Sequence, residues 1–136
     1  MKIEVINAPA GSGSGKTEKL LIRGNEIQQK HQTRLITIES KDEYIKMRYE
    51  DITGCKCGFP VVEFQLGDFI SKVEEYIKSQ KDIKVLMIDN PFLLYCGANY
   101  MAKHINTIKN QLDSLSKDCD IDIVYTMNTK RELIDD

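Results

Sequence analysis

The sequence predicts an α/β protein, with a parallel β-sheet between two layers of helices. Short segments rich in β-branched and apolar residues alternate with longer segments in which apolar residues recur every three or four positions. Residues 84–89 (KVLMID) are almost continuously apolar, which is typical of a strand buried on both faces of a parallel sheet. Strands that alternate with helices favour this three-layer architecture.

Two strands and one helix are predicted at the start of the chain. Residues 1–7 contain spaced apolar side chains and predict a strand that enters a glycine-rich turn at 10–15. A helix is expected over 16–30, where leucine and isoleucine recur at helical spacing. The short β-branched segment 34–38 (RLITI) predicts the second strand.

The remaining elements alternate in the same way. They are predicted as a helix over 41–50, a strand over 61–64, a helix over 68–79, a strand over 84–89, a helix over 99–118 and a strand over 121–126. Glycine and proline in 53–60 separate the first two of these. The helices over 68–79 and 99–118 each carry one apolar stripe, so we expect each to cover a face of the sheet.

The chain length of 136 residues favours a single domain spanning 1–136. Hydrophobic residues make up 41% of the chain, which is enough for one core and excludes global disorder. Residues 129–136 are polar and are expected to form a flexible tail.

Charge and segment composition exclude some classes of function. The chain has 19 Lys and Arg against 21 Asp and Glu, so it lacks the basic surplus of a protein that wraps nucleic acid non-specifically. Any nucleic-acid contact must come from a local basic patch or from charges pooled by several subunits. The chain has no apolar run of about 20 residues and no signal peptide, so we expect a cytoplasmic protein without a membrane segment.

The four cysteines do not form a recognisable zinc motif. Cys55 and Cys57 are spaced C-x-C, and no second pair with flanking histidines completes four ligands. We expect Cys55, Cys57, Cys96 and Cys119 to be reduced thiols, with a metal site as the alternative.

A phosphate-binding motif lies between the first predicted strand and the first predicted helix. Residues 10–17 (AGSGSGKT) fit the P-loop pattern, with alanine in the first position where glycine is commoner. Glycines allow successive backbone N–H groups to converge on phosphate oxygens, and the following helix directs its positive end at the same anion. The candidate cofactor-binding residues are Ala10, Gly11, Ser12, Gly13, Ser14, Gly15, Lys16 and Thr17. The alternative is a solvated turn rich in glycine and serine.

Three side chains supply the chemistry that this motif predicts. Lys16 is expected to reach the β- and γ-phosphates of ATP, and the Thr17 hydroxyl is expected to ligate Mg²⁺. Asp89 closes an apolar strand, at the edge where parallel sheets place ligand-binding groups. We therefore expect it to hold Mg²⁺ through water, opposite Thr17. Alternatively, Asp89 caps a turn, because an Asn-Pro pair follows it.

The order of four segments resembles the RecA-type core of P-loop NTPases, most closely the ATPase domain of DnaB-type replicative helicases. The segments are the P-loop, RLITIES, KVLMIDNPFLLY and IVYTMNTKR. Thr37-Ile38-Glu39 stands where that family has a Ser-Leu-Glu-like triplet, so the resemblance implies that Glu39 polarises the attacking water. Asn128 stands where the family carries a polar γ-phosphate sensor, with Arg131 three residues on. From the residues alone, Glu39 could instead cap the next helix, and Asn128 could occupy a turn.

The chain resembles a shortened member of that family. The helix after the triplet carries a Met-Arg pair in the family, matched here by Met47-Arg48. Between residues 58 and 61 the family has several dozen more residues, and beyond Arg131 it has a DNA-binding loop and an arginine finger. An Asn-Pro pair also follows Asp89, where the family continues with an aromatic residue.

The resemblance implies a Mg²⁺-dependent, ATP-hydrolysing protein linked to DNA replication or recombination. Its expected partners are single-stranded DNA or a DNA-processing protein, and further copies of itself in a homo-oligomer. One alternative is a nucleotide-binding scaffold or interaction module without motor activity, because the family's arginine finger and DNA loop are missing. A second alternative is a small nucleoside-type kinase, since GKTEKLLIRGNEI followed by RLITIES is similar to the opening of type II thymidine kinases. That family's Asp-Glu turn and zinc lobe are not found in this sequence.

Overall fold

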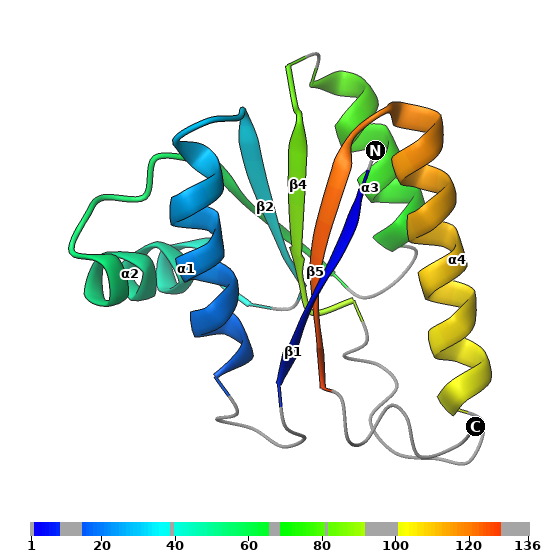
Figure 1. The fold of residues 1–136 in the computed structure, drawn as a ribbon, viewed down its shortest axis with the longest axis horizontal. Helices are drawn as coiled ribbons and strands as arrows, with labels where there is room; N and C mark the ends of the chain where they lie inside the picture. The colour runs from blue at the N-terminus through cyan, green and yellow to red at the C-terminus, as the bar shows by residue number, and fades with distance from the viewer. Residues whose placement is uncertain are drawn as a thin grey trace.

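The chain folds into alternating strands and helices (Figure 1). The structure is a computed structural model, and it describes residues 2–8, 15–38, 40–65, 69–80, 82–91 and 101–128. In chain order, the elements are β1 (Ile3–Ala8), α1 (Lys16–Gln28), β2 (Thr33–Ile38), α2 (Asp42–Thr53), β3 (Val61–Phe64), α3 (Phe69–Ser79), β4 (Val85–Asp89), α4 (Met101–Cys119) and β5 (Asp122–Asn128). Each strand and helix predicted from the sequence is present.

The strands form one sheet in the order β1-β5-β4-β2-β3, and every neighbouring pair is parallel. From β1 to β3 the chain moves across the sheet in one direction, and from β3 to β5 it moves back. Because crossovers between parallel strands are right-handed, the two directions place their helices on opposite faces. Figure 1 shows α1 and α2 on one face, and α3 and α4 on the other. The predicted α/β class, with a parallel sheet flanked by helices, is confirmed.

Alternate strand positions contribute to two separate hydrophobic cores. On the face of α1 and α2, the buried strand residues are Leu35, Val61, Val85, Met87 and Val124. On the face of α3 and α4, they are Ile36, Ile38, Leu86, Ile88, Ile123, Tyr125 and Met127. Successive residues of a strand point to opposite faces, so β4, which is covered on both sides, is buried throughout. This explains the continuous apolar sequence that predicts β4.

Helix α2 extends beyond its predicted end at residue 50. It continues to Thr53 and stops at Gly54, which has a φ of 74°. The Gly54 N–H donates a hydrogen bond of 2.9 Å to the Glu50 carbonyl and so closes the last turn. Glycine adopts this left-handed conformation without the steric cost of a Cβ, so the glycine sets the end of the helix.

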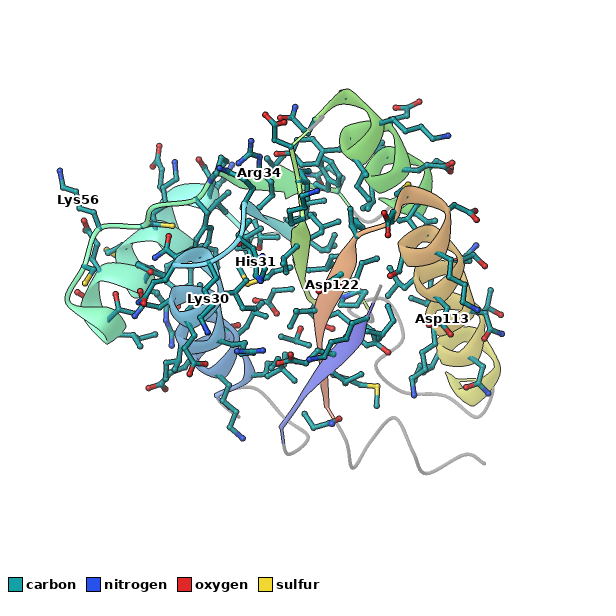
Figure 2. The ribbon with its side chains drawn as sticks, turned by 45° about the horizontal axis from the view of Figure 1, so that its top comes forward. Lys30, His31, Arg34, Lys56, Asp113 and Asp122 are labelled. Atoms are coloured by element: carbon teal, nitrogen blue, oxygen red, sulfur yellow. The ribbon has the colours of Figure 1, made fainter. Side chains whose placement is uncertain are left out.

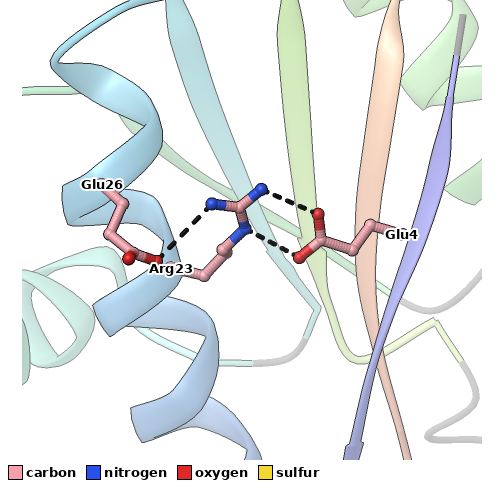
Figure 3. Close-up of polar contacts among 3 residues, drawn as sticks. All are labelled: Glu4, Arg23 and Glu26. Carbon is pink, nitrogen blue, oxygen red and sulfur yellow. Dashed lines mark hydrogen bonds and ion pairs between the residues drawn. The ribbon is translucent and has the colours of Figure 1, made fainter.

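An ion pair joins α1 to β1, the two elements that flank the predicted P-loop (Figure 3). The Arg23 guanidinium donates two hydrogen bonds to the Glu4 carboxylate, at 2.8 Å from Nε and 3.0 Å from Nη2. Glu26 lies 3.5 Å from Nη1 of the same guanidinium. The hydrogen bonding to Glu4 is the largest cause of the raised pKa of Arg23. The pair therefore helps to fix the orientation of α1 against the sheet.

Free thiols are present in the described residues at Cys55, Cys57 and Cys119. Burial raises the pKa of the Cys57 thiol, which disfavours the thiolate. Cys96 and the predicted tail at 129–136 lie outside the described residues.

None of the helices in the described part of the chain has both the length and the apolar character needed to cross a lipid bilayer.

Candidate functional site

The carboxyl ends of the strands meet the first turn of α1 at one edge of the sheet (Figure 1). Helix α1 begins at Lys16, directly after Gly15, which has a φ of 85°. The Gly15 carbonyl accepts a hydrogen bond of 2.9 Å from the Lys19 N–H. Glycine supplies a left-handed turn that residues with a Cβ rarely adopt. The predicted start of the helix at residue 16 is confirmed, and the positive end of α1 faces this edge.

Asp89, the last residue of β4, is 7% exposed and is held by two hydroxyl groups. Its Oδ2 accepts a hydrogen bond of 2.8 Å from Thr17 Oγ1, and its Oδ1 accepts one of 2.8 Å from Thr126 Oγ1. Thr17 lies in the first turn of α1, 72 positions away in the sequence. The fold therefore brings together the two side chains that the sequence predicts as Mg²⁺ ligands. It also adds Thr126 to the group.

Strand order and register explain this grouping. Strand β4 lies between β5, which carries Thr126, and β2, where Thr37 is the register partner of Asp89. Asp89 has the parity of Met87, which belongs to the core beneath α1 and α2. Thr126, Asp89 and Thr37 thus form a row of polar residues across neighbouring strands, on the face covered by α1.

Thr126 carries no local signal that separates it from ordinary strand residues, and Thr37 enters the sequence analysis only as the first residue of the triplet that resembles Ser-Leu-Glu, with no role of its own. Threonine is common in strands because its β-branched side chain suits an extended backbone. Their position beside Asp89 follows from the order of the strands, which the local pattern does not contain. Sequence reasoning therefore misses both residues.

Strand β5 lies between β1 and β4, so the strand that enters the glycine-rich segment and the strand that ends in Asp89 are not neighbours. Helix α1 crosses β5 to bring Thr17 to Asp89. The hydroxyl–carboxylate contact depends on this crossing, which the ion pair between Arg23 and Glu4 supports from the β1 side.

Helix α2 carries Arg48, the arginine of the Met-Arg pair, whose pKa is affected by the Asp89 carboxylate. Arg48 donates a hydrogen bond of 3.2 Å to the Tyr44 hydroxyl and lies 5.8 Å from the centroid of the Tyr44 ring. The hydrogen bond to Tyr44 is the largest cause that raises the pKa of Arg48, and the negative charges of Glu18 and Asp89 contribute less. This arginine, the second residue of the Met-Arg pair, therefore contacts Tyr44, and Asp89 affects its pKa only weakly.

The donor set at this edge suits Mg²⁺. Thr17 and Asp89 offer a hydroxyl and a carboxylate, and Mg²⁺ prefers oxygen ligands of this kind. Among the described residues, no group of three or more His, Cys, Asp or Glu side chains is placed to hold a metal by itself. Mg²⁺ at this edge would therefore take further ligands from phosphate and water, as is usual in nucleotide sites.

Several predicted site residues lie partly or wholly outside the described structure. Residues 10–14 of the P-loop and Glu39 are among those not described. Lys16 is half-buried at the start of α1. Asn128 ends β5 and is the register partner of Ala8, so its backbone lies at the same edge of the sheet as the site.

Two alternatives drawn from the sequence can be compared with the fold. The N-cap of α2 is Lys41, which makes no side-chain capping hydrogen bond, whereas Glu39, the residue for which capping was the alternative, lies outside the described residues. Both carboxylate oxygens of Asp89 accept hydrogen bonds from hydroxyl groups of other elements. Such contacts tie α1 and β5 to β4, which differs from the local backbone contact of a turn cap.

Comparison with known proteins finds no family model that matches the chain and no similar curated protein. Interpretation of the site therefore depends on the motifs and on the geometry of Thr17, Asp89 and the start of α1.

Proposed function

We propose that this chain binds ATP with Mg²⁺ and hydrolyses it, as a RecA-type P-loop ATPase of the DnaB-like branch. The main support is the 2.8 Å hydrogen bond between the Thr17 hydroxyl and the Asp89 carboxylate. It joins the glycine-rich motif to a strand-end carboxylate at the edge where open α/β sheets bind ligands. P-loop NTPases hold Mg²⁺ with such a hydroxyl and carboxylate.

Each part of the site has a role in this proposal. The backbone N–H groups of 10–15 and the positive end of α1 receive phosphate oxygens, and the Lys16 ammonium contacts the β- and γ-phosphates. The hydroxyl–carboxylate pair holds Mg²⁺, which neutralises phosphate charge when it is bound. As the resemblance implies, Glu39 polarises the attacking water and Asn128 contacts the γ-phosphate.

Nucleotide binding and turnover test the proposal. Lys16→Ala removes the charge expected on the phosphates, so we expect at least tenfold weaker binding of ATP in Mg²⁺ and loss of hydrolysis. Lys72→Ala is the matched control, because Lys72 is an exposed lysine on α3, on the opposite face of the sheet. Equal affinity and turnover in Lys16→Ala and the parent would refute the proposal.

Two outcomes would favour the alternatives instead. ATP binding by the parent without any turnover, with or without single-stranded DNA, would indicate a nucleotide-binding scaffold. Transfer of labelled phosphate from ATP to a nucleoside would indicate a kinase.

We also propose that the chain acts in DNA replication or recombination and contacts single-stranded DNA or a DNA-processing protein. A hollow of about 600 Å³ at the amino ends of β2 and β4 is lined by Lys30, His31, Arg34 and Lys84, and none of its described lining residues is acidic. Figure 2 shows Lys30, His31 and Arg34 gathered around the segment between α1 and β2, with Asp122 nearby. In a chain with a net charge of −2, the lysine and arginine side chains of this hollow, Lys30, Arg34 and Lys84, are suited to a phosphate backbone.

A further inference from the structure

One buried hydroxyl in the sheet has no hydrogen-bond partner. Thr37 on β2 is 1% exposed, and its Oγ1 is buried without a partner in the described residues. A hydroxyl removed from water without a partner is costly, and nearly all buried polar groups in proteins are hydrogen-bonded. The presence of threonine at this position is therefore not explained by packing alone.

Other buried hydroxyls in the described residues are paired. Thr33, which is on the same strand and face, donates a hydrogen bond of 2.9 Å to a backbone carbonyl. Thr126 donates to Asp89, and Ser116 of α4 donates to a backbone carbonyl. Thr37 differs from these residues, because its hydroxyl has no hydrogen-bond partner among the described residues.

Thr37 lies directly beside the candidate metal ligand. Thr37 and Asp89 are register partners on β2 and β4. On the other side of Asp89, Thr126 of β5 donates a hydrogen bond to Oδ1, while Thr17 of α1 donates one to Oδ2. Asp89 is thus flanked in the sheet by two threonines, of which one is bonded to it and the other is not.

We propose that Thr37 is a further positioning residue of the nucleotide site. Its hydroxyl binds an ordered water that belongs to the coordination shell of Mg²⁺ when ATP is bound. The inference rests on the ATP and Mg²⁺ binding proposed at Thr17 and Asp89. Mg²⁺ keeps several waters in nucleotide sites, and hydrogen bonds from surrounding groups orient the ligands of a metal. A hydroxyl, which both donates and accepts, suits this task, whereas a valine of the same shape does not.

Two substitutions separate the hydroxyl from the shape of the side chain. Thr37→Val keeps the shape and removes the hydroxyl, whereas Thr37→Ser keeps the hydroxyl and removes a methyl group. Thr33→Val is the matched control, because Thr33 is buried on the same face of β2 at its opposite end. For each protein, the dissociation constant for ATP is measured in Mg²⁺ and in EDTA, and the melting temperature is measured without nucleotide.

The variants are expected to change ATP affinity and melting temperature differently. Thr37→Val should bind ATP about tenfold more weakly in Mg²⁺, equal to about 1.4 kcal/mol, and should change less than twofold in EDTA. Its melting temperature should equal or exceed that of the parent, because the hydroxyl it loses has no hydrogen-bond partner in the part of the chain that the structure describes. Thr37→Ser should bind as the parent does but melt at a lower temperature, because it leaves a small cavity. Thr33→Val should melt at a lower temperature with both affinities unchanged.

Three results would overturn the inference. If Thr37→Val binds ATP in Mg²⁺ as well as the parent, the hydroxyl has no role at the metal, while the proposed function stands. If Thr37→Val loses the same factor of ATP affinity in Mg²⁺ and in EDTA, the hydroxyl acts on the nucleotide or on the fold and not on a metal-bound water. A parent that binds no ATP would overturn the proposed function together with the inference, and the parent measured in the same series distinguishes this case.

Discussion

Replacing Thr126 with valine should destabilise the protein although the two side chains have nearly the same shape. Thr126 is fully buried, and its hydroxyl donates a hydrogen bond of 2.8 Å to Asp89 Oδ1. A hydrogen bond to a charged acceptor contributes about 1.5–3 kcal/mol, and valine leaves a buried carboxylate oxygen without it. We expect the free energy of unfolding to fall by about 2 kcal/mol. At about 4 °C per kcal/mol for a chain of this length, the melting temperature should fall by about 8 °C.

Urea unfolding followed by circular dichroism, without nucleotide, measures this loss. Thr37→Val is the matched comparison, because it makes the same substitution on the other side of Asp89, where no described residue pairs with the hydroxyl. Thr126→Val should lose stability, and Thr37→Val should not. If Thr126→Val unfolds within about 0.5 kcal/mol of the parent, or if both variants lose the same amount, Asp89 is not held by the Thr126 hydroxyl and the reasoning is refuted.

Further predictions concern the ion pair between Arg23 and Glu4, Tyr49 in the core beneath α1 and α2, and the hollow lined by Lys30, Arg34 and Lys84. Arg23→Met keeps the aliphatic stem but removes both hydrogen bonds to β1. It should lower the free energy of unfolding by about 1 kcal/mol, and by less at high salt; no change in urea unfolding would show that this partly exposed pair contributes nothing. Burial raises the pKa of Tyr49 in the folded state, so the unfolded state loses this proton first. Stability should fall as the pH rises above about 10, and in alkaline urea unfolding Tyr49→Phe should weaken this dependence rather than leave it intact. Lys30→Glu combined with Arg34→Glu should weaken binding of a labelled single-stranded oligonucleotide at least tenfold in fluorescence anisotropy. Lys56→Glu, which changes an exposed lysine beyond α2, should weaken it less than twofold, and equal effects would argue against the hollow as the contact.

Much of the fold could be predicted because each element carries its own local signal. The continuous apolar run of β4 reflects burial on both faces, and the stripe of α4 reflects burial on one side. Boundaries were harder to predict where a single backbone conformation sets them, as at Gly54, which ends α2 later than the apolar pattern suggests.

The candidate site, too, has a part that could be predicted from the sequence and a part that could not. The glycine-rich motif is contiguous, and Asp89 ends an apolar strand, so Thr17 and Asp89 could both be predicted as site residues. Their positions opposite each other were expected from the motif, but the direct hydrogen bond between them could not be predicted, because it depends on how α1 crosses β5 to reach β4.

By itself, the sequence determined the α/β class and the alternation of elements, and it predicted the residues proposed to bind phosphate and metal. These properties depend on side-chain chemistry and on periodicity within a few turns or strand positions, and both are local. The tertiary structure alone decided that Asp89 accepts hydrogen bonds from both Thr17 and Thr126, and that Thr37 lies beside it with a hydroxyl that no other described residue pairs with. Strand order and register bring these residues together, and both arise from packing between segments far apart in the chain.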